Sequence, residues 1–471
     1  MGSSAGPLNL LMWENKRTSV EKQRGVMSYP FGPVVQPLSF PGLLEHFRSV
    51  IGGFPDKRTG QNSRYSLEDA ALGAFAVFFT QSPSFLAYQK AMQEAKGQSN
   101  AQTLFGMQHI PTDNHIRDLL DEVAPSQVFP VFAYVFDALK AGGHLADFRC
   151  SLGDLLICLD GTQYFSSKKI HCQNCSTRQH KEGSTTYTHS VVTPVVVTPG
   201  RSQVIPLEPE FILPQDGHDK QDCEAVAGQR WLEQYGARYS SLGITILGDD
   251  LYCRQPMCER IGQAGWHFIL VCKSDSHPTL YEWLQGLELS GGVYTLTLQR
   301  WNGKMHEVDT YRYAHQVPLR DGEDALLVHW CELTTRREDG KVLYHNAFAT
   351  DHPLTEANVP QVVAAGRARW KVENENNNTL KTKGYQLEHN YGHGKKHLSS
   401  LLASFIILAF LFHTVLELVD EKYQLIRRKL PTRKTFFDDI RALTRYLCFD
   451  SWDMLLRFRM RGLELAIPGT N

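Results

Sequence analysis

Leu155-Leu-Ile-Cys-Leu-Asp160-Gly-Thr-Gln-Tyr-Phe165 is the stretch on which our prediction of the fold depends. Five apolar residues lead directly into an aspartate and a glycine, which is typical of a short buried strand that ends in a turn. A carboxylate at the end of a buried strand is costly unless it is solvated, paired or bound to a metal. The simpler alternative is that Asp160 only caps the turn that follows it.

Two more acidic positions extend this pattern. Residues 244–248 form a second apolar run, and Asp249 and Asp250 follow it. Neighbouring strand residues face opposite sides, so only one of these aspartates can point into a shared site. Glu373 lies in the segment 367–375, which lacks strand alternation and is predicted to be helical. Carboxylates from such segments suit Mg²⁺, and two divalent ions (Mg²⁺ or Mn²⁺) about 3.5–4 Å apart support phosphodiester chemistry.

The order Asp160, Asp249 and Glu373 resembles the catalytic triad of the DDE transposases of bacterial insertion sequences. The resemblance covers about 155–418 and implies a ribonuclease-H-like core in which these three residues hold the Mg²⁺ ions. It also implies a helical N-terminal region that binds the ends of the element. Tyr252, three residues after Asp249, matches the family's Asp-x-x-Tyr pattern and favours Asp249 over Asp250 as the ligand.

More narrowly, the chain is similar to the insertion-sequence-four superfamily, whose third motif reads Tyr-x2-Arg-x3-Glu-x6-Lys. Arg369 and Glu373 have this spacing. Gly366 stands at the Tyr position, and Lys381 lies one residue further along than the motif has it. The resemblance implies that Arg369 and Lys381 contact DNA phosphates near the active site.

The choice between Glu373 and Glu375 depends on helix geometry. Residues two positions apart on an α-helix point about 200° apart around its axis, so only one of these glutamates can face the aspartates. Arg369 lies one turn before Glu373, and Trp370 is expected to pack against the sheet and fix the helix rotation. Glu375 is expected to form a solvent-exposed pair with Lys371. These relations favour Glu373 as the third ligand.

The predicted fold class is α/β: a ribonuclease-H-like mixed sheet with flanking helices, an N-terminal helical domain and a β-rich insertion. With 471 residues the chain is long enough for two or three domains. We expect a loose N-terminal arm (1–40), a helical domain (41–150) and the first part of the catalytic core (151–284). The β-rich insertion (285–350), the last part of the core with the catalytic glutamate (351–420) and a basic C-terminal helical region (421–471) follow.

Helices are predicted at 43–50, 67–79, around 116–121 and at 128–139, and a long strand at 187–198. The formal charge of the whole chain is −1, which gives no general attraction to nucleic acid. Residues 367–471 contain 18 Lys and Arg against 11 Asp and Glu, so a basic surface is expected there. A solvated helical face would give the same count. The ten cysteines are scattered and no secretory signal opens the chain, which favours a reducing cytoplasm.

A cysteine pair between the first two acidic motifs suggests a structural zinc site. Cys172 and Cys175 have the Cys-x2-Cys spacing and the sulfur ligands that such sites use. The candidate nitrogen ligands nearby are His171, His180 and His189. The alternative is a pair of reduced cysteines in a loop. No second ligand pair was identified to complete the site.

Acidic residues also crowd the segment 216–224, with Asp216, Asp219, Asp222 and Glu224. We interpret them as a loop that runs into a helix, where acids in the first turn are favoured by the helix dipole. A calcium loop is the alternative, but the ligand positions of an EF-hand are not filled.

The segment 286–349 alternates as strands do, and Asn302-Gly303 predicts a tight turn. An insertion here accounts for the 124 positions between Asp249 and Glu373. In the resembling family an aromatic residue of this insertion can hold a flipped base, and Trp301 is the candidate. A Trp that packs in the core or against the turn is the alternative.

Residues 398–419 are apolar over about the length that crosses a bilayer. Polar residues interrupt the run and no second span is present in the sequence, so we predict a helix buried against the central sheet and no membrane partner.

Together these features predict a Mg²⁺-dependent transposase that nicks the ends of an element and joins their 3′-hydroxyls to target DNA. The expected partners are double-stranded terminal inverted repeats, target DNA and a second copy of the chain in a DNA-bound homodimer, in the bacterial cytoplasm at the nucleoid. The alternatives are a stand-alone metal-dependent nuclease and a catalytically silent DNA-binding relative.

Overall fold

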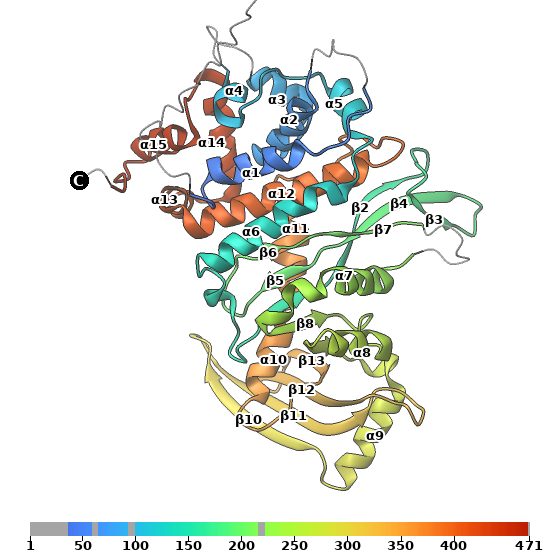
Figure 1. Cartoon of the computed structure of the whole chain (residues 1–471). Helices are drawn as coiled ribbons and strands as arrows, with labels where there is room; N and C mark the ends of the chain where they lie inside the picture. Colours follow the sequence, from blue (N-terminus) through green and yellow to red (C-terminus); the bar gives the residue numbers. More distant parts are fainter. Residues whose placement is uncertain (1–35, 59–64, 93–98, 215–221, 470–471) are drawn as a thin grey trace, which may run out of the picture. The chain divides into compact units, whose positions relative to one another are not determined.

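Two sheets and a group of helices make up the described part of the protein (Figure 1), and the first acidic motif lies where the chain passes from one sheet to the other. The computed structural model describes residues 36–58, 65–92, 99–214 and 222–469. The predicted arm therefore lies outside the described residues up to position 35, and α1 begins at Phe40 with Ser39 as its N-cap. Asp216 and Asp219 also lie outside them.

A nine-stranded mixed sheet runs in the order β10-β11-β12-β13-β9-β8-β1-β5-β6. Its strands are β1 (Leu155–Cys158), β5 (Val195–Val197), β6 (Ile205–Pro206), β8 (Ile244–Gly248), β9 (His267–Val271), β10 (Tyr294–Trp301), β11 (His306–Pro318), β12 (Leu327–Arg337) and β13 (Val342–Thr350). β1 pairs in parallel with β8, and β8 in parallel with β9. The other pairings, including that of β13 with β9, are antiparallel.

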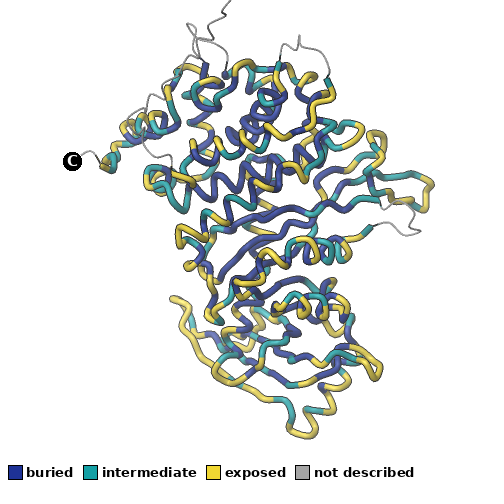
Figure 2. Tube along the Cα trace, viewed as in Figure 1, coloured by how far each residue is buried: buried dark blue, intermediate teal, exposed yellow. Residues whose placement is uncertain are grey.

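The two central strands β1 and β8 are buried at every residue, which agrees with their unbroken apolar sequences. By contrast, β10 at the far edge is exposed along most of its length (Figure 2). The β-rich character predicted for 285–350 is confirmed in strands β10–β13, and these strands extend the main sheet. The prediction that β structure begins at 286 is wrong, because α9 (Pro278–Leu289) continues to Leu289.

A second, four-stranded sheet contains β2 (Gly161–Ser167), β3 (Ser176–Gln179), β4 (Thr185–Val192) and β7 (Glu210–Ile212). The prediction of one strand at 187–198 is wrong, because the chain leaves this sheet after Val192 and enters the large sheet at Val195. Pro194 lies at the change of sheet, and proline has no N–H to continue a ladder.

Helices cover the sheets and flank the acidic motifs. They are α7 (Glu224–Tyr239), α8 (Gln255–Gln263), α9, α10 (Val359–Arg367), the π-helical turn η5 (Val372–Asn377) and α11 (Asn378–Thr382), with the short 3-10 turns η3 (Ser240–Leu242) and η4 (Ser274–Ser276).

The remaining helices pack together on one side of β6. They are α1 (Phe40–Ile51), α2 (Leu67–Phe79), α3 (Phe85–Ala91), α4 (Asn100–Phe105), α5 (Asp113–Leu120), η1 (Pro125–Val128), α6 (Phe129–Ala141), η2 (Ala146–Phe148), α12 (Leu398–Val419), α13 (Glu421–Lys429), α14 (Arg433–Tyr446) and α15 (Trp452–Gly462). Most begin at a Ser, Thr or Asp whose side chain accepts a first-turn N–H, as in α2, where Ser66 accepts from Asp69.

The predicted N-terminal and C-terminal helical regions form one body around α12. The Phe75 ring contacts the Phe412 ring at 5.2 Å, and the Phe40 ring contacts the Trp452 ring at 4.9 Å. Six basic residues of α13–α15 and their connections form ion pairs with acids, so less of the predicted basic surplus is free for phosphate. The division into two separate helical regions is therefore wrong.

Helix α12 has the length and hydropathy of a membrane span, with a mean hydropathy of 2.2, yet 83% of that apolar window is buried inside the protein. The predicted burial is confirmed, although α12 contacts more helices than strands, mainly α2 and α13 besides β6. His413 in this helix pairs through Nε2 with the Phe79 carbonyl (2.8 Å) and through Nδ1 with the Tyr423 hydroxyl (2.9 Å). Burial lowers the pKa of His413 to about 3, so it is a neutral core residue.

Candidate functional site

Asp160 lies at the point where two antiparallel segments change from one sheet to the other. β1 ends at Cys158 and β2 begins at Gly161, while β4 ends at Val192 and β5 begins at Val195. The Thr193 N–H donates to the Asp160 carbonyl at 3.0 Å and holds the two crossings together. Because the ladder is interrupted here, the Asp160 side chain can face neighbouring elements.

The segment that carries Glu373 is fixed directly to Asp160. Asn377, four residues after Glu373, donates from Nδ2 to Asp160 Oδ2 at 2.8 Å. The amide oxygen of Asn377 accepts from the Thr193 hydroxyl at 2.9 Å. Arg369 lies on the other side, with Nη1 3.9 Å from Asp160 Oδ1. The first and third predicted motifs therefore meet, although they are more than 200 positions apart in the sequence.

The electrostatics of Asp160 show that other acids lie near it. Burial raises the pKa of Asp160 to about 7, and the charges of Glu224, Asp249 and Glu373 raise it as well. The Arg369 guanidinium acts in the opposite direction. The other two acids predicted from the sequence, Asp249 and Glu373, therefore both act on Asp160, together with a fourth acid, Glu224.

Glu224 was not identified from the sequence as part of the site. It is the first residue of α7, and its Oε1 accepts the Gly161 N–H at 2.8 Å. A Cβ atom at position 161 would lie 2.3 Å from Glu224 Oε2, so this approach requires glycine. Burial raises the pKa of Glu224, while the Gly161 N–H and the Tyr252 hydroxyl lower it. The available signal was the glycine directly after Asp160.

The two aspartates after β8 have different surroundings. Asp249 Oδ1 accepts the Leu251 N–H at 2.9 Å, and the Asp249 charge acts on Asp160. Asp250 Oδ1 instead accepts the Lys273 N–H at 2.8 Å and lies 3.4 Å from His277 Nε2. Asp250 thus joins the end of β8 to the segment after β9, and Asp249 is the residue near the other acids.

Two expectations about the helix of Glu373 are wrong. Trp370 is 44% exposed and does not pack in the core. Lys371 is buried, and its Nζ donates to the Arg201 carbonyl, so it cannot form a solvent-exposed pair with Glu375. The physical reason is that this segment is not one α-helix: α10 ends at Arg367, and residues 372–377 form a π-helical turn whose wider i→i+5 repeat changes which side chains share a face. Glu373 itself is exposed.

The two departures from the insertion-sequence-four motif have structural correlates. A Cβ atom at Gly366 would lie 2.8 Å from Ile269 Cγ2 and 2.9 Å from the Phe348 ring, because α10 packs closely on β9 and β13. No larger side chain fits at this position without displacing the core. Lys381 Nζ pairs with Glu388 Oε1 at 3.0 Å.

The acid site is open compared with a formed metal cluster. Within the described ranges, three groups of His, Cys, Asp or Glu have ligand atoms that all lie within 4.8 Å of one another, and the acids around Asp160 are not among them. Four carboxylates with one nearby guanidinium nevertheless form a strongly anionic oxygen donor set, which suits a hard divalent cation. Asp160, Asp249 and Glu373 could hold Mg²⁺, and Glu224 lies beside them.

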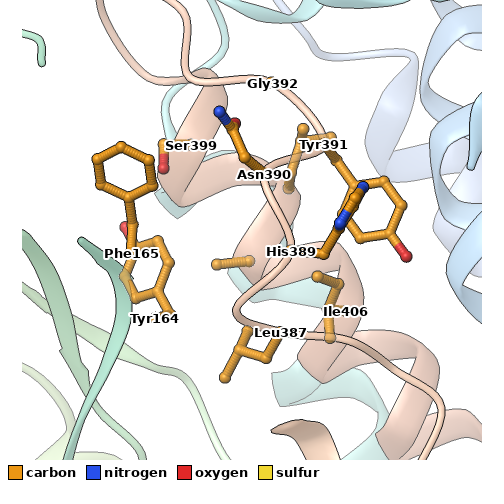
Figure 3. A pocket seen from close by; sticks show the side chains of 11 residues that line it. Tyr164, Phe165, Leu387, His389, Asn390, Tyr391, Gly392, Ser399 and Ile406 are labelled. Carbon is orange, nitrogen blue, oxygen red and sulfur yellow. The ribbon is translucent and has the colours of Figure 1, made fainter. Parts of the chain in front are cut away.

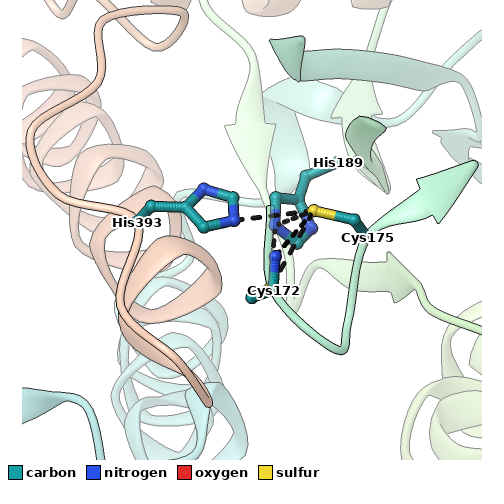
Figure 4. A group of neighbouring side chains, drawn as sticks. All are labelled: Cys172, Cys175, His189 and His393. Atoms are coloured by element: carbon teal, nitrogen blue, oxygen red, sulfur yellow. Dashed lines mark hydrogen bonds between the residues drawn. The ribbon is translucent and has the colours of Figure 1, made fainter. Parts of the chain in front are cut away.

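A second cluster is formed by Cys172, Cys175, His189 and His393 (Figure 4). The two sulfur atoms are 3.9 Å apart, His189 Nε2 lies 3.5 and 3.4 Å from them, and His393 Nε2 lies 3.5 Å from Cys175 Sγ. The Cys175 thiol and both imidazoles lower the pKa of Cys172. The sequence correctly brought the two cysteines and His189 together.

The other two predicted nitrogen ligands lie elsewhere. His171 stacks on Tyr187 and bonds through Nδ1 with the Lys169 carbonyl, and His180 Nε2 bonds with the Thr186 hydroxyl. His393 comes from the segment before α12 and was missed. The signal was available, because His389 and His393 form a His-x3-His pair. Only His393 of this pair joins the cluster, and His189 of β4 supplies the other nitrogen.

Trp301 lies at the end of β10, beside the hairpin turn, and is 59% exposed. Its ring contacts the His306 ring of the paired strand at a centroid distance of 4.9 Å. A core position for this Trp is excluded, and its ring lies against His306 at the start of β11.

Comparisons of the chain with models of protein families and with curated proteins find no match.

Proposed function

We propose that this protein is a DNA transposase that nicks the ends of a mobile element and joins their 3′-hydroxyls to target DNA. The observation that carries the proposal is the hydrogen bond from Asn377 to Asp160, which joins the segment of Glu373 to the end of β1. Together with the influence of Asp249 on Asp160, it supports a single site built from the three acids in the order that the resemblance implies.

The strand arrangement supports a ribonuclease-H-like core. The strands β6, β5 and β1 form an antiparallel meander, and β8 and β9 follow in parallel with β1 on its other side. Asp160 and Asp249 follow the adjacent parallel strands β1 and β8, so both leave the sheet at the same edge. β10–β13 then form the insertion before Glu373.

The residues of the site have distinct roles in this proposal. Asp160, Asp249 and Glu373 hold two Mg²⁺ ions, or Mn²⁺, which when bound activate a water or a 3′-hydroxyl and stabilise the leaving oxygen. Asn377 is a positioning residue, because it orients Asp160 without being able to carry charge. Arg369 offsets part of the negative charge beside Asp160 and can donate to a phosphate oxygen.

DNA contacts outside the triad remain part of the proposal. Arg369 and Lys381 contact phosphates, for which Lys381 must exchange its partner Glu388. The exposed ring of Trp301 can stack on a base at the cleaved end. We also propose a homodimer on paired DNA ends and a bacterial cytoplasmic, nucleoid-associated location.

The test uses a plasmid that carries the DNA flanking both sides of the gene, incubated with the full-length protein and Mg²⁺. We expect nicks at the element ends and, with pre-cleaved ends, products joined to a second plasmid. Asp249→Asn should abolish both products, whereas Asp250→Asn, the matched control, should retain a measurable fraction. An inactive Asp250→Asn together with an active Asp249→Asn would show that Asp250, and not Asp249, is the second ligand.

The same assay separates the two rival functions. A stand-alone nuclease would hydrolyse DNA with Mg²⁺ and the same acids but never join a 3′-hydroxyl to a target. A catalytically silent relative would bind the flanking DNA and give neither product. Either result would refute transposition.

A further inference from the structure

We propose that Cys172, Cys175, His189 and His393 bind one zinc ion, and that this ion fastens the segment after the third acidic motif to the small sheet. The site is separate from the acids around Asp160, so the proposal does not depend on the function proposed above. It assigns the four ligands by geometry, where the sequence alone suggested five candidates.

The spacing of the four ligand atoms matches a tetrahedron around zinc. Zn–S bonds of about 2.3 Å and Zn–N bonds of about 2.0–2.1 Å require S···S and S···N separations of about 3.8 and 3.6 Å in a tetrahedral site. The S···S separation here is 3.9 Å, and the three S···N separations are 3.4–3.5 Å. Ordinary packing has no reason to bring four such atoms to these distances.

The chemical character of the ligands also favours zinc. Two sulfur and two imidazole ligands are the donor set of closed structural zinc sites, and Cys172 and Cys175 have the Cys-x2-Cys spacing typical of them. The Nε2 atoms of His189 and His393 both face the sulfurs, as ligand nitrogens of a shared metal ion would. All four residues are buried or half-buried, which leaves no open position for a substrate.

A disulfide does not explain the arrangement. The sulfur atoms are 3.9 Å apart, whereas a disulfide bond is about 2.05 Å long. It would also leave both imidazole Nε2 atoms against disulfide sulfurs, which are weak hydrogen-bond acceptors. A metal ion satisfies all four ligands at once.

The ion would join two parts of the chain that meet along a crevice. Cys172 and Cys175 lie between β2 and β3, His189 lies on β4, and His393 lies in the segment that leads into α12. The crevice beside them has Tyr164 and Phe165 of β2 on one side and residues 387–392 on the other (Figure 3). The Phe165 ring contacts the His393 ring at 4.4 Å, so the two sides touch at the cluster.

This position gives the metal a structural role close to the acid site. β2 begins directly after Asp160, and the His393 segment follows the helix of Glu373 by 20 positions. Fastening β2, β3 and β4 to this segment therefore limits how far the first and third acidic motifs can separate. Binding to the folded chain also stabilises it, since the four ligands are not assembled in the unfolded state.

The experiment measures metal rather than DNA cleavage. The full-length protein, purified without chelator from cells grown with zinc, is analysed for metal content. It is then exchanged with Co²⁺, whose absorption reports tetrahedral thiolate ligation. We expect one zinc ion per chain and a thiolate-to-cobalt band. Zinc removal should lower the melting temperature by about 5 °C or more, and zinc should restore it.

Matched histidine variants test which residues are ligands. His393→Ala should lose the zinc, whereas His393→Cys should retain it, since Cys₃His is also a zinc donor set. His389→Ala changes a histidine four residues earlier in the same segment and should keep full zinc content. His171→Ala and His180→Ala should also keep it, although the sequence alone made them candidates.

Three results would overturn the proposal. The first is wild-type protein with neither zinc nor a thiolate-to-cobalt band, a result that does not depend on any variant folding. The second is loss of zinc in His171→Ala or His180→Ala with full zinc in His393→Ala. The third is a Cys172–Cys175 disulfide, detected by mass spectrometry in protein purified in air. That result would identify the two cysteines as a redox pair.

Discussion

The acid site and the Cys–His cluster each bring together residues near β2 and residues after position 370, yet they differ in how closely their ligands approach. The ligand atoms of Cys172, Cys175, His189 and His393 all lie within 4.8 Å of one another. The carboxylates around Asp160 do not form such a group, and Glu373 is exposed to solvent. Both sites draw on residues near the small sheet and on residues after position 370.

The difference follows from the charge of the ligands. Neutral thiols and imidazoles can approach one another without a cation, so the Cys–His cluster is already compact. Carboxylates repel one another, and the raised pKa of Asp160 reports the combined effect of this repulsion and burial. An open arrangement of acids is therefore expected before a divalent ion neutralises them, and the predictions below test this contrast.

The largest effect is expected from neutralising the third acid. Glu373→Gln should reduce Mg²⁺-dependent nicking and strand transfer by about 10³-fold or more, since an amide cannot neutralise a divalent ion. Binding to DNA ends, measured by gel shift, should change little. Glu375→Gln is the matched control, because Glu375 acts on the buried Lys371, and its activity should change by no more than several-fold. An inactive Glu375→Gln together with an active Glu373→Gln would show that Glu375, and not Glu373, is the third ligand.

The second effect concerns stability without added Mg²⁺. Because folding raises the pKa of Asp160 from its ordinary value to about 7, the folded state prefers the protonated acid. The resulting loss of folding stability is small near pH 4, grows as the pH rises, and reaches its full size above pH 7. Asp160→Asn removes the charge at every pH, so it should stabilise the metal-free protein by about 2–4 kcal/mol at pH 8.

Denaturant unfolding at pH 5 and pH 8 checks this expectation. The advantage of Asp160→Asn should increase by about 2 kcal/mol between these values, and Mg²⁺ should stabilise only the wild type. Asp250→Asn keeps an amide oxygen that can accept the Lys273 N–H but loses the charge beside His277, so it should give no stabilisation at either pH. Equal stability of Asp160→Asn and wild type at pH 8 would show that the acids do not repel one another as proposed.

The sequence predicted those parts of the molecule in which local pattern and burial agree. The apolar runs of β1 and β8 and the largely apolar segment of α2, which is buried at every position except Glu68, were recognised because apolar side chains favour the core. Asp160 and Asp249 were recognised because each follows such an apolar run, and the structure shows that the two strands are adjacent and parallel and so end at one edge of the sheet.

What could not be predicted depends on contacts between distant elements. Glu224 looked like an ordinary first-turn acid, and only the close approach of Gly161 brings it into the site. Asn377 lies in a run of three asparagines, and the π-helical turn decides which of them reaches Asp160. His393 is 204 positions from His189, so local spacing could not connect them.

A third, smaller effect tests whether packing against β9 and β13 positions α10, the helix that leads to Glu373. Gly366→Ala places a Cβ atom against Ile269 and Phe348 in the core, which should destabilise the protein by about 1–3 kcal/mol. Gly366→Tyr restores the residue of the family motif but should be far more disruptive, with loss of soluble protein. Gly262→Ala on α8, where nothing lies within 4 Å of the new Cβ, is the control and should be neutral or slightly stabilising. Full stability of Gly366→Tyr would show that α10 is not fixed against β9 and β13.

The smallest effect concerns the contact between Gly161 and Glu224, and it requires a double-mutant cycle. In Gly161→Ala the new Cβ atom lies 2.3 Å from Glu224 Oε2, so the flexible carboxylate must move and lose the Gly161 N–H. Because a side-chain end can move cheaply, the cost should be only about 1 kcal/mol, comparable with one hydrogen bond. Glu224→Ala should cost a similar amount through the same lost bond, offset in part by relief of the repulsion with Asp160. If the two changes remove one interaction, the double variant should be no less stable than Gly161→Ala, with a coupling of about 1 kcal/mol. Denaturant unfolding at pH 8 without Mg²⁺ measures all four proteins. Additive costs would mean that Gly161 and Glu224 act independently, and Glu224 would then be an ordinary first-turn acid of α7.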